Sequence, residues 1–285
     1  MNVYVILAIQ LLFASVTHIA AKAVVGEVDA LTLTLLRNVI SVVGFYSILI
    51  VRGIGVRIDK EYRRSIFLLG FLVVLNQYLY LYGMKYTTAA NGALLYALTP
   101  IFVLILSRFF LTEKITLQKS LGIMLAFIGV TVVIFERGIS TTAEFAFGNI
   151  IILLAVITYA LFTILGKPLV LKFGALSTAA SANFTGLLLV LPLGFYNAAT
   201  FPYERLHTLD WIGILYLGIG TSIIGYLLWY YALRRIDATR LAVFANGQPI
   251  VTSILSVIFL GTTITPQFII GGIVTLAGVI ITQRK

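Results

Sequence analysis

Cysteine is absent from this sequence of 285 residues, and histidine occurs only twice, as His18 and His207. The absence of cysteine excludes disulfide bonds, thiolate metal sites and cysteine nucleophiles. The residue spacings typical of zinc hydrolases, serine hydrolases and acidic metal sites are also missing. We therefore expect that the protein is not an enzyme and has no catalytic residue, no metal site and no cofactor.

Charged residues are scarce, and long apolar runs take their place. Charged residues make up 11% of the chain and hydrophobic residues 60%, whereas a soluble domain has about 25% charged residues. The mean hydropathy is +1.07. A run of about 20 apolar residues is long enough to cross a bilayer. We predict an all-α integral membrane protein with ten transmembrane helices near Val3–Val25, Ala30–Val51, Ser65–Tyr86, Thr88–Leu111, Lys119–Phe135, Phe147–Leu171, Leu176–Tyr196, Trp211–Leu233, Ala238–Leu260 and Phe268–Thr282.

The connections between these spans are short. Thr87 alone separates the third span from the fourth, and Arg234–Asp237 separates the eighth from the ninth. No soluble domain fits between them. The first span begins close to Met1 without a basic leader region or a small-residue cleavage site, so we expect a retained helix rather than a signal peptide.

Lysine and arginine are concentrated on one side of the predicted bundle, and the formal net charge is +10. Cytoplasmic loops collect these residues, so we expect a multi-pass protein of the cytoplasmic membrane with both termini in the cytoplasm. Topology accounts for the positive charge, so we expect the lipid bilayer and a small-molecule substrate as partners, and no nucleic acid. The sequence leaves the oligomeric state open. The basic side carries Arg52, Arg57, Lys60, Arg63, Arg64, Arg108, Lys114, Lys119, Lys172, Arg234, Arg235, Arg240, Arg284 and Lys285, and the opposite side carries Lys22, Lys85, Arg137 and Arg205.

The sequence contains an internal repeat. The stretch from Tyr82 onwards aligns without a gap with the stretch from Tyr231 to the end, at a constant offset of 149. We predict a first repeat of five helices at 1–138, a short extracytoplasmic linker at 139–146 and a second repeat at 147–285. Five is an odd number, so the second repeat is inverted in the membrane, an arrangement that lets transporters expose one site to each side in turn. The aligned identities include Ala89/Ala238, Pro100/Pro249, Leu106/Leu255, Phe110/Phe259, Thr116/Thr265, Gly122/Gly271 and Gly129/Gly278.

Several motifs follow one another in a characteristic order. Tyr86–Pro100 precedes Leu111–Thr116, Gly122 and Gly129, and the second repeat has Pro249, Leu260, Thr265, Gly271 and Gly278 at the matching places. With Lys22 and Arg37 in the first two spans, this pattern resembles the EamA family of the drug/metabolite transporter superfamily over the whole chain. The resemblance implies ten helices in two inverted repeats around a central cavity, and export or exchange of small metabolites, often amino acids. One departure is that Thr262 stands where Glu113 is found in the first repeat.

The third span carries amides in its middle. Asn76, Gln77 and Tyr80 lie within five residues, and we predict that they bind substrate. Interhelical hydrogen bonding is the structural alternative. Two amides facing lipid would be costly unless they are paired or face a wet cavity, which favours a cavity at least as much as a structural role.

The fourth and ninth spans carry the second polar set. Pro100 and Pro249 occupy matching positions, and each removes a helix hydrogen bond and bends the axis. We predict that both are hinges. A simple kink that shapes the bundle is the alternative. We predict that the neighbouring side chains of Tyr96, Asn246 and Gln248 bind substrate.

The first, sixth and eighth spans add His18, Tyr159 and Tyr226 as predicted substrate-binding residues. Tryptophan is common at membrane interfaces, so we expect Trp229 to be an interfacial anchor rather than a cavity wall.

Lys22, Arg37 and Lys167 are basic residues that lie within or near spans. Lys22 and Lys167 occupy matching places near opposite ends of the first and sixth spans, and Arg37 lies about two turns into the second. We predict a gating or structural role for all three. Snorkelling to the interface is the alternative for the two lysines. Arg37 is deeper, so it must pair or face water.

These observations favour a secondary transporter that moves small metabolites by alternating access, with export of an amino acid, a related metabolite or a drug as the leading hypothesis. All ten carboxylates lie in loops or at span ends, and proton-driven carriers commonly use acidic residues or histidine inside the membrane. Only His18 is available, so we expect facilitated diffusion or exchange. A flippase of the same fold for a lipid-linked substrate is one alternative. A membrane scaffold without transport is another, but it leaves the buried amides without a purpose.

Overall fold

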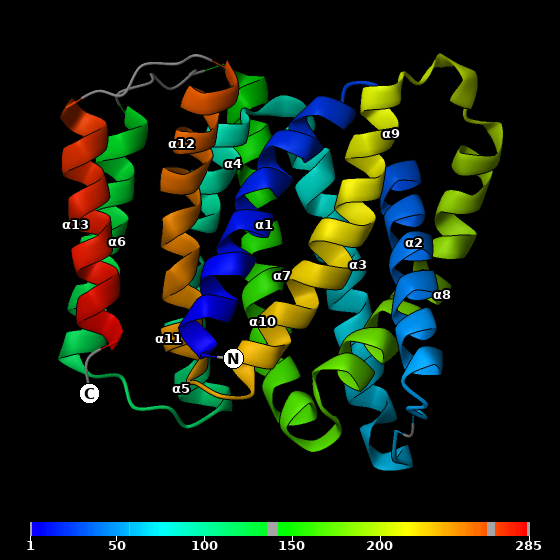
Figure 1. Cartoon of the computed structure of the whole chain (residues 1–285), viewed down its shortest axis with the longest axis horizontal. Helices are drawn as coiled ribbons and strands as arrows, with labels where there is room; N and C mark the ends of the chain where they lie inside the picture. The colour runs from blue at the N-terminus through cyan, green and yellow to red at the C-terminus, as the bar shows by residue number, and fades with distance from the viewer. Residues whose placement is uncertain (1, 57, 136–141, 261–265, 284–285) are drawn as a thin grey trace.

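The computed structural model describes residues 2–56, 58–135, 142–260 and 266–283, and these residues contain helices but no β-strand. The elements have the following bounds (Figure 1): α1 Val3–Val24, α2 Ala30–Val51, η1 Lys60–Tyr62, α3 Arg63–Tyr86, α4 Ala89–Tyr96, α5 Thr99–Phe110, α6 Leu117–Phe135, α7 Ala143–Phe173, α8 Ala175–Thr200, η2 Tyr203–Arg205, α9 Thr208–Leu215, η3 Tyr216–Gly225, α10 Tyr226–Leu233, α11 Ala238–Ala242, η4 Val243–Gly247, α12 Gln248–Leu260 and α13 Pro266–Gln283.

Seven helical segments of the described chain are long and apolar enough to cross a membrane, and two shorter apolar helices accompany them at Leu117–Gly129 and Ile269–Thr282. Large apolar side chains cover the outside of the bundle, for example Val51, Phe109 and Leu193. Monomeric soluble proteins rarely expose apolar surface of this extent. The protein is therefore a multi-pass membrane protein. The seven segments are Val3–Val24, Ala30–Val51, Lys60–Tyr86, Asn91–Phe110, Ala143–Phe173, Ala175–Thr200 and Thr208–Leu233.

Polar residues mark the starts of several helices. Asp29 accepts hydrogen bonds from the backbone amides of Leu31 and Thr32 at the start of α2. Thr88 and Thr142 cap α4 and α7 in the same manner. Each cap satisfies a backbone N–H that has no partner inside its helix. The short loops between apolar runs thus supply both the turns and the caps.

Three of the predicted spans are not continuous α-helices. The fourth span is divided into α4 and α5, with Ala97 and Leu98 between them, and Pro100 is the second residue of α5. The ninth is divided into α11, the 3₁₀ turn η4 and α12, and Pro249 is the second residue of α12. The eighth contains a π-helical segment, η3, between α9 and α10. Non-helical backbone at membrane depth is tolerated where protein or a wet cavity surrounds it.

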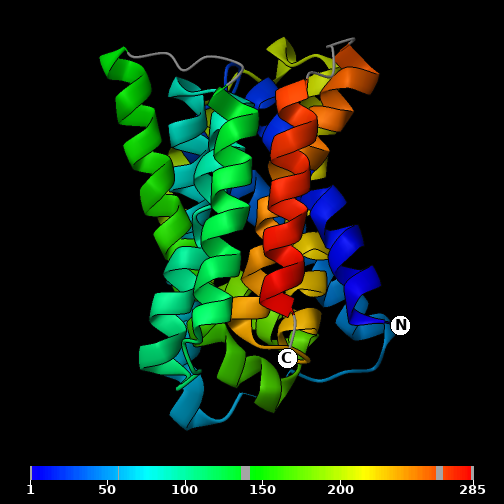
Figure 2. The ribbon, with the colours of Figure 1, turned by 90° about the vertical axis from the view of Figure 1, so that its left-hand side faces the viewer.

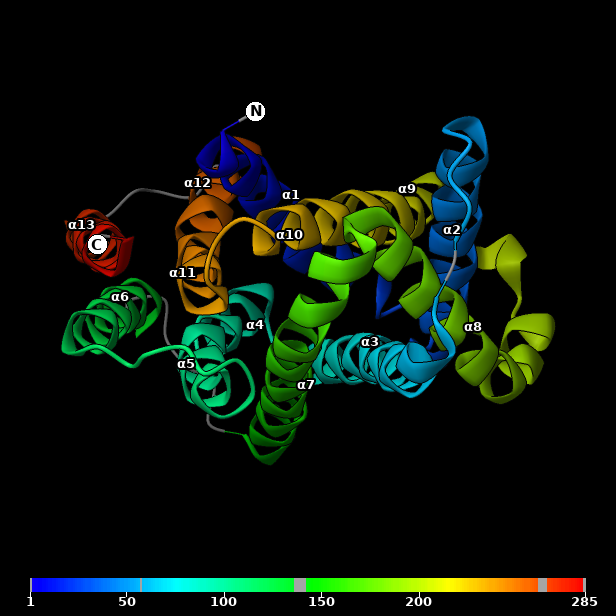
Figure 3. The same cartoon turned by 90° about the horizontal axis from the view of Figure 1, so that it is seen from below.

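The helices form a broad bundle with both chain ends at the same end of the molecule (Figures 1 and 2). Seen along the helix axes, the pair α6 and α13 occupies one edge, and α2 and α8 occupy the other (Figure 3). α3 packs against both α7 and α8. Between the two edges, α1 and α10 lie across from α3 and α7 (Figure 3). This central group positions the site described next.

Candidate functional site

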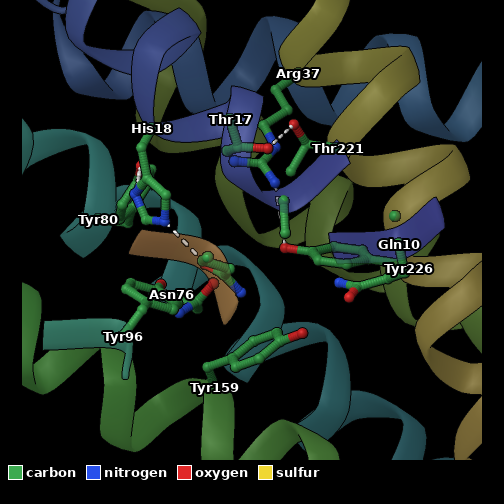
Figure 4. A pocket seen from close by; sticks show the side chains of 13 residues that line it. Gln10, Thr17, His18, Arg37, Asn76, Tyr80, Tyr96, Tyr159, Thr221 and Tyr226 are labelled. Atoms are coloured by element: carbon green, nitrogen blue, oxygen red, sulfur yellow. Dashed lines mark hydrogen bonds between the residues drawn. The ribbon is translucent and has the colours of Figure 1, made fainter. Parts of the chain in front are cut away.

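A polar pocket lies among these central helices (Figure 4). The empty space within it, including the space open at its mouth, is about 540 Å³. The pocket is lined by Gln10, Ala14, Thr17 and His18 of α1, Arg37 of α2, Asn76 and Tyr80 of α3, Tyr96 of α4, Tyr159 of α7, Thr221 and Gly225 of η3, Tyr226 of α10 and Gln248 of α12.

His18 joins three helices on one side of the pocket. Its Nε2 lies 2.9 Å from Gln248 Oε1, and its Nδ1 lies 2.8 Å from the hydroxyl of Tyr80. The amide oxygen accepts, so Nε2 carries the proton and Nδ1 accepts from the tyrosine. The imidazole is thereby fully paired in its neutral form.

Asn76 and Tyr96 form a second pair close to His18. The Asn76 amide nitrogen donates to the carbonyl oxygen of Ala155 at 2.7 Å and to the Tyr96 hydroxyl at 3.0 Å. The rings of Tyr80 and Tyr96 meet edge to face, with centroids 5.3 Å apart. Aromatic pairs favour this geometry, so the amide and the rings hold one another in a fixed arrangement.

Arg37 lines the opposite side and is only 3% exposed. Its Nε donates to Ser222 Oγ at 2.6 Å, and one Nη donates to the Tyr226 hydroxyl at 3.3 Å. The guanidinium carbon also lies 5.8 Å from the centre of the Tyr226 ring. None of the ion pairs among the described residues includes Arg37.

Aromatic rings close the pocket along α7 and α10. Tyr159 packs against Tyr96 at 5.9 Å and against Trp229 at 5.3 Å between ring centroids. Trp229 is 1% exposed, and its indole N–H donates to Thr163 Oγ1 at 3.1 Å. The expectation of an interfacial anchor at Trp229 is therefore wrong: its N–H finds a partner inside the bundle, so the ring is buried rather than placed at the interface.

The predicted substrate-binding residues divide into two groups. Gln77 and Asn246 are fully buried and lie outside the pocket lining. Gln77 donates to the Tyr226 hydroxyl from behind, at 3.4 Å, and both polar atoms of Asn246 are without a partner among the described residues. The pocket brings together the other predicted residues, which are His18, Asn76, Tyr80, Tyr96, Tyr159, Tyr226 and Gln248.

Several lining residues were not predicted from the sequence. Gln10, Ala14, Thr17 and Thr221 were not predicted, and Arg37 was predicted only as a gating or structural charge. A signal was present, because the lining residues of α1 recur at intervals of three and four and therefore share one helix face. Thr17 and Thr221 contact each other across the pocket, with their hydroxyl oxygens 2.7 Å apart.

The two predicted gating lysines lie beyond the pocket, on α1 and α7. Lys22 donates to the carbonyl oxygens of Met84 and Lys85, at the end of α3. Lys167 donates to the carbonyl oxygen of Ile236 after α10 and pairs with Glu113. Lys22 thus satisfies carbonyls at the end of α3 that have no partner in their own helix, and Lys167 satisfies a carbonyl of the loop between α10 and α11.

The groups that line the pocket are suited to binding a small molecule. No cluster of three or more His, Cys, Asp or Glu residues that could hold a metal is found in the described part of the chain. The lining offers amides, hydroxyls, one guanidinium and aromatic faces, and no carboxylate. Such groups can bind a small polar molecule and orient it, while the rings can bound an apolar part.

The sequence was compared with those of known proteins, and it is similar to members of one family. The sequence model of the EamA-like transporter family matches residues 1–135 and 146–284. The chain is 29% identical over 284 residues to "Uncharacterized transporter YyaM" of Bacillus subtilis (strain 168), which covers 98% of this chain and 93% of that protein. It is 30% identical over 287 residues to an "Uncharacterized transporter" of Archaeoglobus fulgidus, with all of both chains covered.

A more distant relative has a more specific name. The "Probable terminal-alkyne amino-acid exporter" of Streptantibioticus cattleyicolor is 26% identical over 207 residues, or 72% of this chain and 67% of that protein. The fold is also similar to that of a solved crystal structure with a TM-score of 0.80 at 17% identity, covering 99% of this chain and 96% of that one.

Proposed function

Because the chain belongs to the EamA-like transporter family, we propose that it is a secondary transporter that moves small metabolites across the cytoplasmic membrane by alternating access. The observation that carries the proposal is a polar pocket in the middle of an apolar bundle, lined by helices from both halves of the chain. Buried polar groups in a membrane are costly, and a substrate that binds among them accounts for their presence.

We propose that ten helices build the transporter as two inverted repeats, at 1–138 and 147–285, joined by the extracytoplasmic linker 139–146. The family model matches each half separately, and both chain ends lie at one end of the bundle (Figure 2). Matching spans are interrupted before Pro100 and before Pro249. The contacts of Lys22 and Lys167 at the ends of α3 and α10 correspond in the same way.

In this proposal Pro100 and Pro249 act as hinges, and the contacts of Lys22 and Lys167 form and break as the pocket opens to one side and then the other. The concentration of lysine and arginine in loops on one side of the bundle supports a cytoplasmic position for both termini. With no carboxylate in the pocket lining, transport proceeds by facilitated diffusion or exchange.

The proposed substrate class is an amino acid or a related metabolite or drug, and the direction is export. The amide and hydroxyl groups of the pocket suit the polar end of such a molecule, and the rings of Tyr96 and Tyr159 suit an apolar side chain. The name of the Streptantibioticus relative is in keeping with this class.

Counterflow in liposomes that contain the purified protein tests the proposal. A panel of amino acids, amines and sugars is offered to the wild type, to Asn76→Ala and Gln248→Ala, and to the control Asn197→Ala, which removes an exposed amide. We expect counterflow of at least one amino acid, its loss in both pocket variants and its retention in the control. Counterflow of no solute contradicts the transporter, and counterflow untouched by the pocket variants contradicts the site.

A further inference from the structure

The pocket contains a buried positive charge without a negative partner. Arg37 is 3% exposed, and the groups that contact its guanidinium are the neutral hydroxyls of Ser222 and Tyr226. No Asp or Glu lines the pocket. A guanidinium has five N–H donors, and these two bonds use only two of them. Burying an ionised group inside a membrane without an oppositely charged partner is energetically costly unless another group compensates its charge.

The hydroxyl of Tyr226 has its own proton to donate. The carbonyl oxygen of Thr34 can only accept, so Asn38 presents its amide nitrogen there, at 2.8 Å, and also donates from it to Gln77 Oε1 at 2.7 Å. Gln77 must then present its nitrogen to the Tyr226 oxygen. That oxygen already accepts from Arg37.

An oxygen that accepts two hydrogen bonds keeps its proton for a third partner. No described residue accepts the Tyr226 proton. The hydroxyl end of Tyr226 points to the middle of the lining side chains, near Arg37 (Figure 4). The series of hydrogen bonds that links Thr34, Asn38 and Gln77 therefore orients the hydroxyl of Tyr226 as a donor towards the pocket.

The facing wall is also set up to donate. Asn76 is oriented by the carbonyl oxygen of Ala155, so it donates to the Tyr96 oxygen, and the Tyr96 proton remains for another acceptor. Gln248 uses its amide oxygen on His18, which leaves its amide nitrogen as a donor. Both walls of the pocket thus present hydrogen-bond donors, and the wall that contains Arg37 also carries a full positive charge.

We propose that the substrate carries a carboxylate, and that Arg37 and Tyr226 bind it. This inference rests on the proposed function and names the charged group of its substrate. The remaining N–H groups of Arg37 match the two oxygens of a carboxylate, and the Tyr226 proton adds a third bond. The bound anion supplies the negative charge that the protein itself does not place beside Arg37. The rest of the substrate lies between the donors of the facing wall and the ring of Tyr159.

The pocket discriminates against molecules that have only a positive charge. An ammonium group can lie against tyrosine rings, but the Arg37 charge repels it and no lining carboxylate attracts it. A zwitterionic amino acid and a simple carboxylic acid are therefore both accepted, whereas an amine or an amino-acid amide is not.

Four ligands of similar shape test this assignment: L-phenylalanine, 3-phenylpropionate, L-phenylalaninamide and 2-phenylethylamine, with phenyl phosphate as a second kind of anion. Binding to the purified protein is measured by titration calorimetry, and transport by counterflow in liposomes. We expect the two acids to bind at least about tenfold more tightly than the amide and the amine, as a hydrogen-bonded charge implies. Equal binding of the amide or the amine, binding of neither acid, or binding of phenyl phosphate alone overturns the proposal.

Variants separate the roles of the residues. Arg37→Gln is expected to weaken binding of the acids by about tenfold or more, while the amide binds as well as before or better because the repulsion by Arg37 is gone. Tyr226→Phe is expected to weaken the acids less. Arg37→Lys keeps the charge and retains part of the affinity, which controls for folding together with the thermal unfolding temperature of each variant. Arg205→Gln removes the same charge from an exposed position and is expected to bind like the wild type.

Binding and counterflow together distinguish the two proposals. Counterflow of an acid that Arg37→Gln leaves unchanged contradicts the assignment of Arg37 and leaves the transporter in place. Counterflow of no member of the panel of amino acids, amines and sugars contradicts the transporter itself.

Discussion

Glu113 and Lys167 form an ion pair whose charged atoms are 2.9 Å apart, and their side chains are only 10% and 15% exposed. Glu113 comes from the loop between α5 and α6, and Lys167 comes from α7. The same carboxylate accepts hydrogen bonds from the backbone amide of Ala238 at 2.9 Å and from the hydroxyl of Thr239 at 3.0 Å, both in α11. One side chain thus ties together both halves of the chain at one end of the bundle.

We predict that Glu113→Gln lowers the free energy of unfolding by about 1–3 kcal/mol, between the values for exposed and fully buried ion pairs. The substitution leaves the Lys167 charge without its partner. Thermal unfolding of the purified protein in detergent measures the effect. Glu204→Gln, at an exposed position, is the matched control and should be neutral. Equal stability of the two variants contradicts a stabilising role for the pair.

The same carboxylate predicts how stability depends on pH. Burial raises the pKa of Glu113, but the pairing with Lys167 and the hydrogen bonds from Ala238 and Thr239 lower it further, so the net pKa lies below its ordinary value of 4.5. A carboxyl with a lowered pKa in the folded state stabilises the protein fully above its ordinary pKa. This contribution is lost as the pH falls through the folded pKa.

We therefore expect acidification below about pH 4.5 to destabilise the wild type more than Glu113→Gln, which has no carboxyl to titrate. Unfolding temperatures measured from pH 7 down to the acid limit of the detergent check this. Parallel pH profiles for the two proteins would show that the pair does not contribute.

Close packing of α6 on α13 gives a third prediction. A Cβ atom at Gly278 would lie 2.5 Å from the carbonyl oxygen of Gly122 and 2.8 Å from Cα of Ala126, whereas a Cβ at Gly272, in the same helix, meets nothing within 4 Å. Gly278→Ala should therefore destabilise the protein by about 1–3 kcal/mol, as overpacking does. Gly272→Ala should be neutral or slightly stabilising, because alanine favours a helix. Unfolding temperatures that rank the two variants in the opposite order contradict this packing.

The absence of carboxylates from the pocket lining predicts transport without proton coupling. Counterflow of the substrate should be the same with and without an imposed pH gradient, and the gradient alone should drive no accumulation. His18 is the titratable group to test, since it is paired in the neutral form by Gln248 and Tyr80. Proton movement that accompanies substrate and disappears in His18→Ala contradicts this mode of transport.

The positions of the helices along the sequence were predicted more accurately than the interruptions within them. Apolar runs locate helices because the bilayer imposes a minimum length on each, and α1, α2 and α3 lie within two residues of their predicted bounds. The interruptions after Tyr96 and Ala242 and the π-helical segment at Tyr216–Gly225 were not predicted. Hydropathy cannot reveal them, because these breaks depend on neighbouring helices that satisfy the freed backbone groups.

The pocket was predictable in kind but not residue by residue. Asn76 and Gln77 are adjacent in sequence, so they point about 100° apart around the helix, and the rotation of α3 alone decides that Asn76 lines the pocket and Gln77 lies behind it. Packing fixes that rotation. The charge of Arg37 was evident from the sequence, but its lack of an acidic neighbour is a property of the folded chain. Trp229 was misplaced because its partner, Thr163, is distant in sequence.

The most direct test of alternating access uses the absence of cysteine from the chain. Ala14→Cys places a single thiol in the pocket lining, and Leu12→Cys, two residues away, places one on an exposed position of the same helix, where lipid covers it. Each variant is treated with a membrane-impermeant maleimide from the outside and, separately, from the inside of oriented vesicles. We predict that the reagent labels Ala14→Cys from both sides, that substrate slows the labelling, and that Leu12→Cys stays unlabelled. Labelling of Ala14→Cys from one side only, with and without substrate, would contradict a transporter that exposes this pocket to each side in turn.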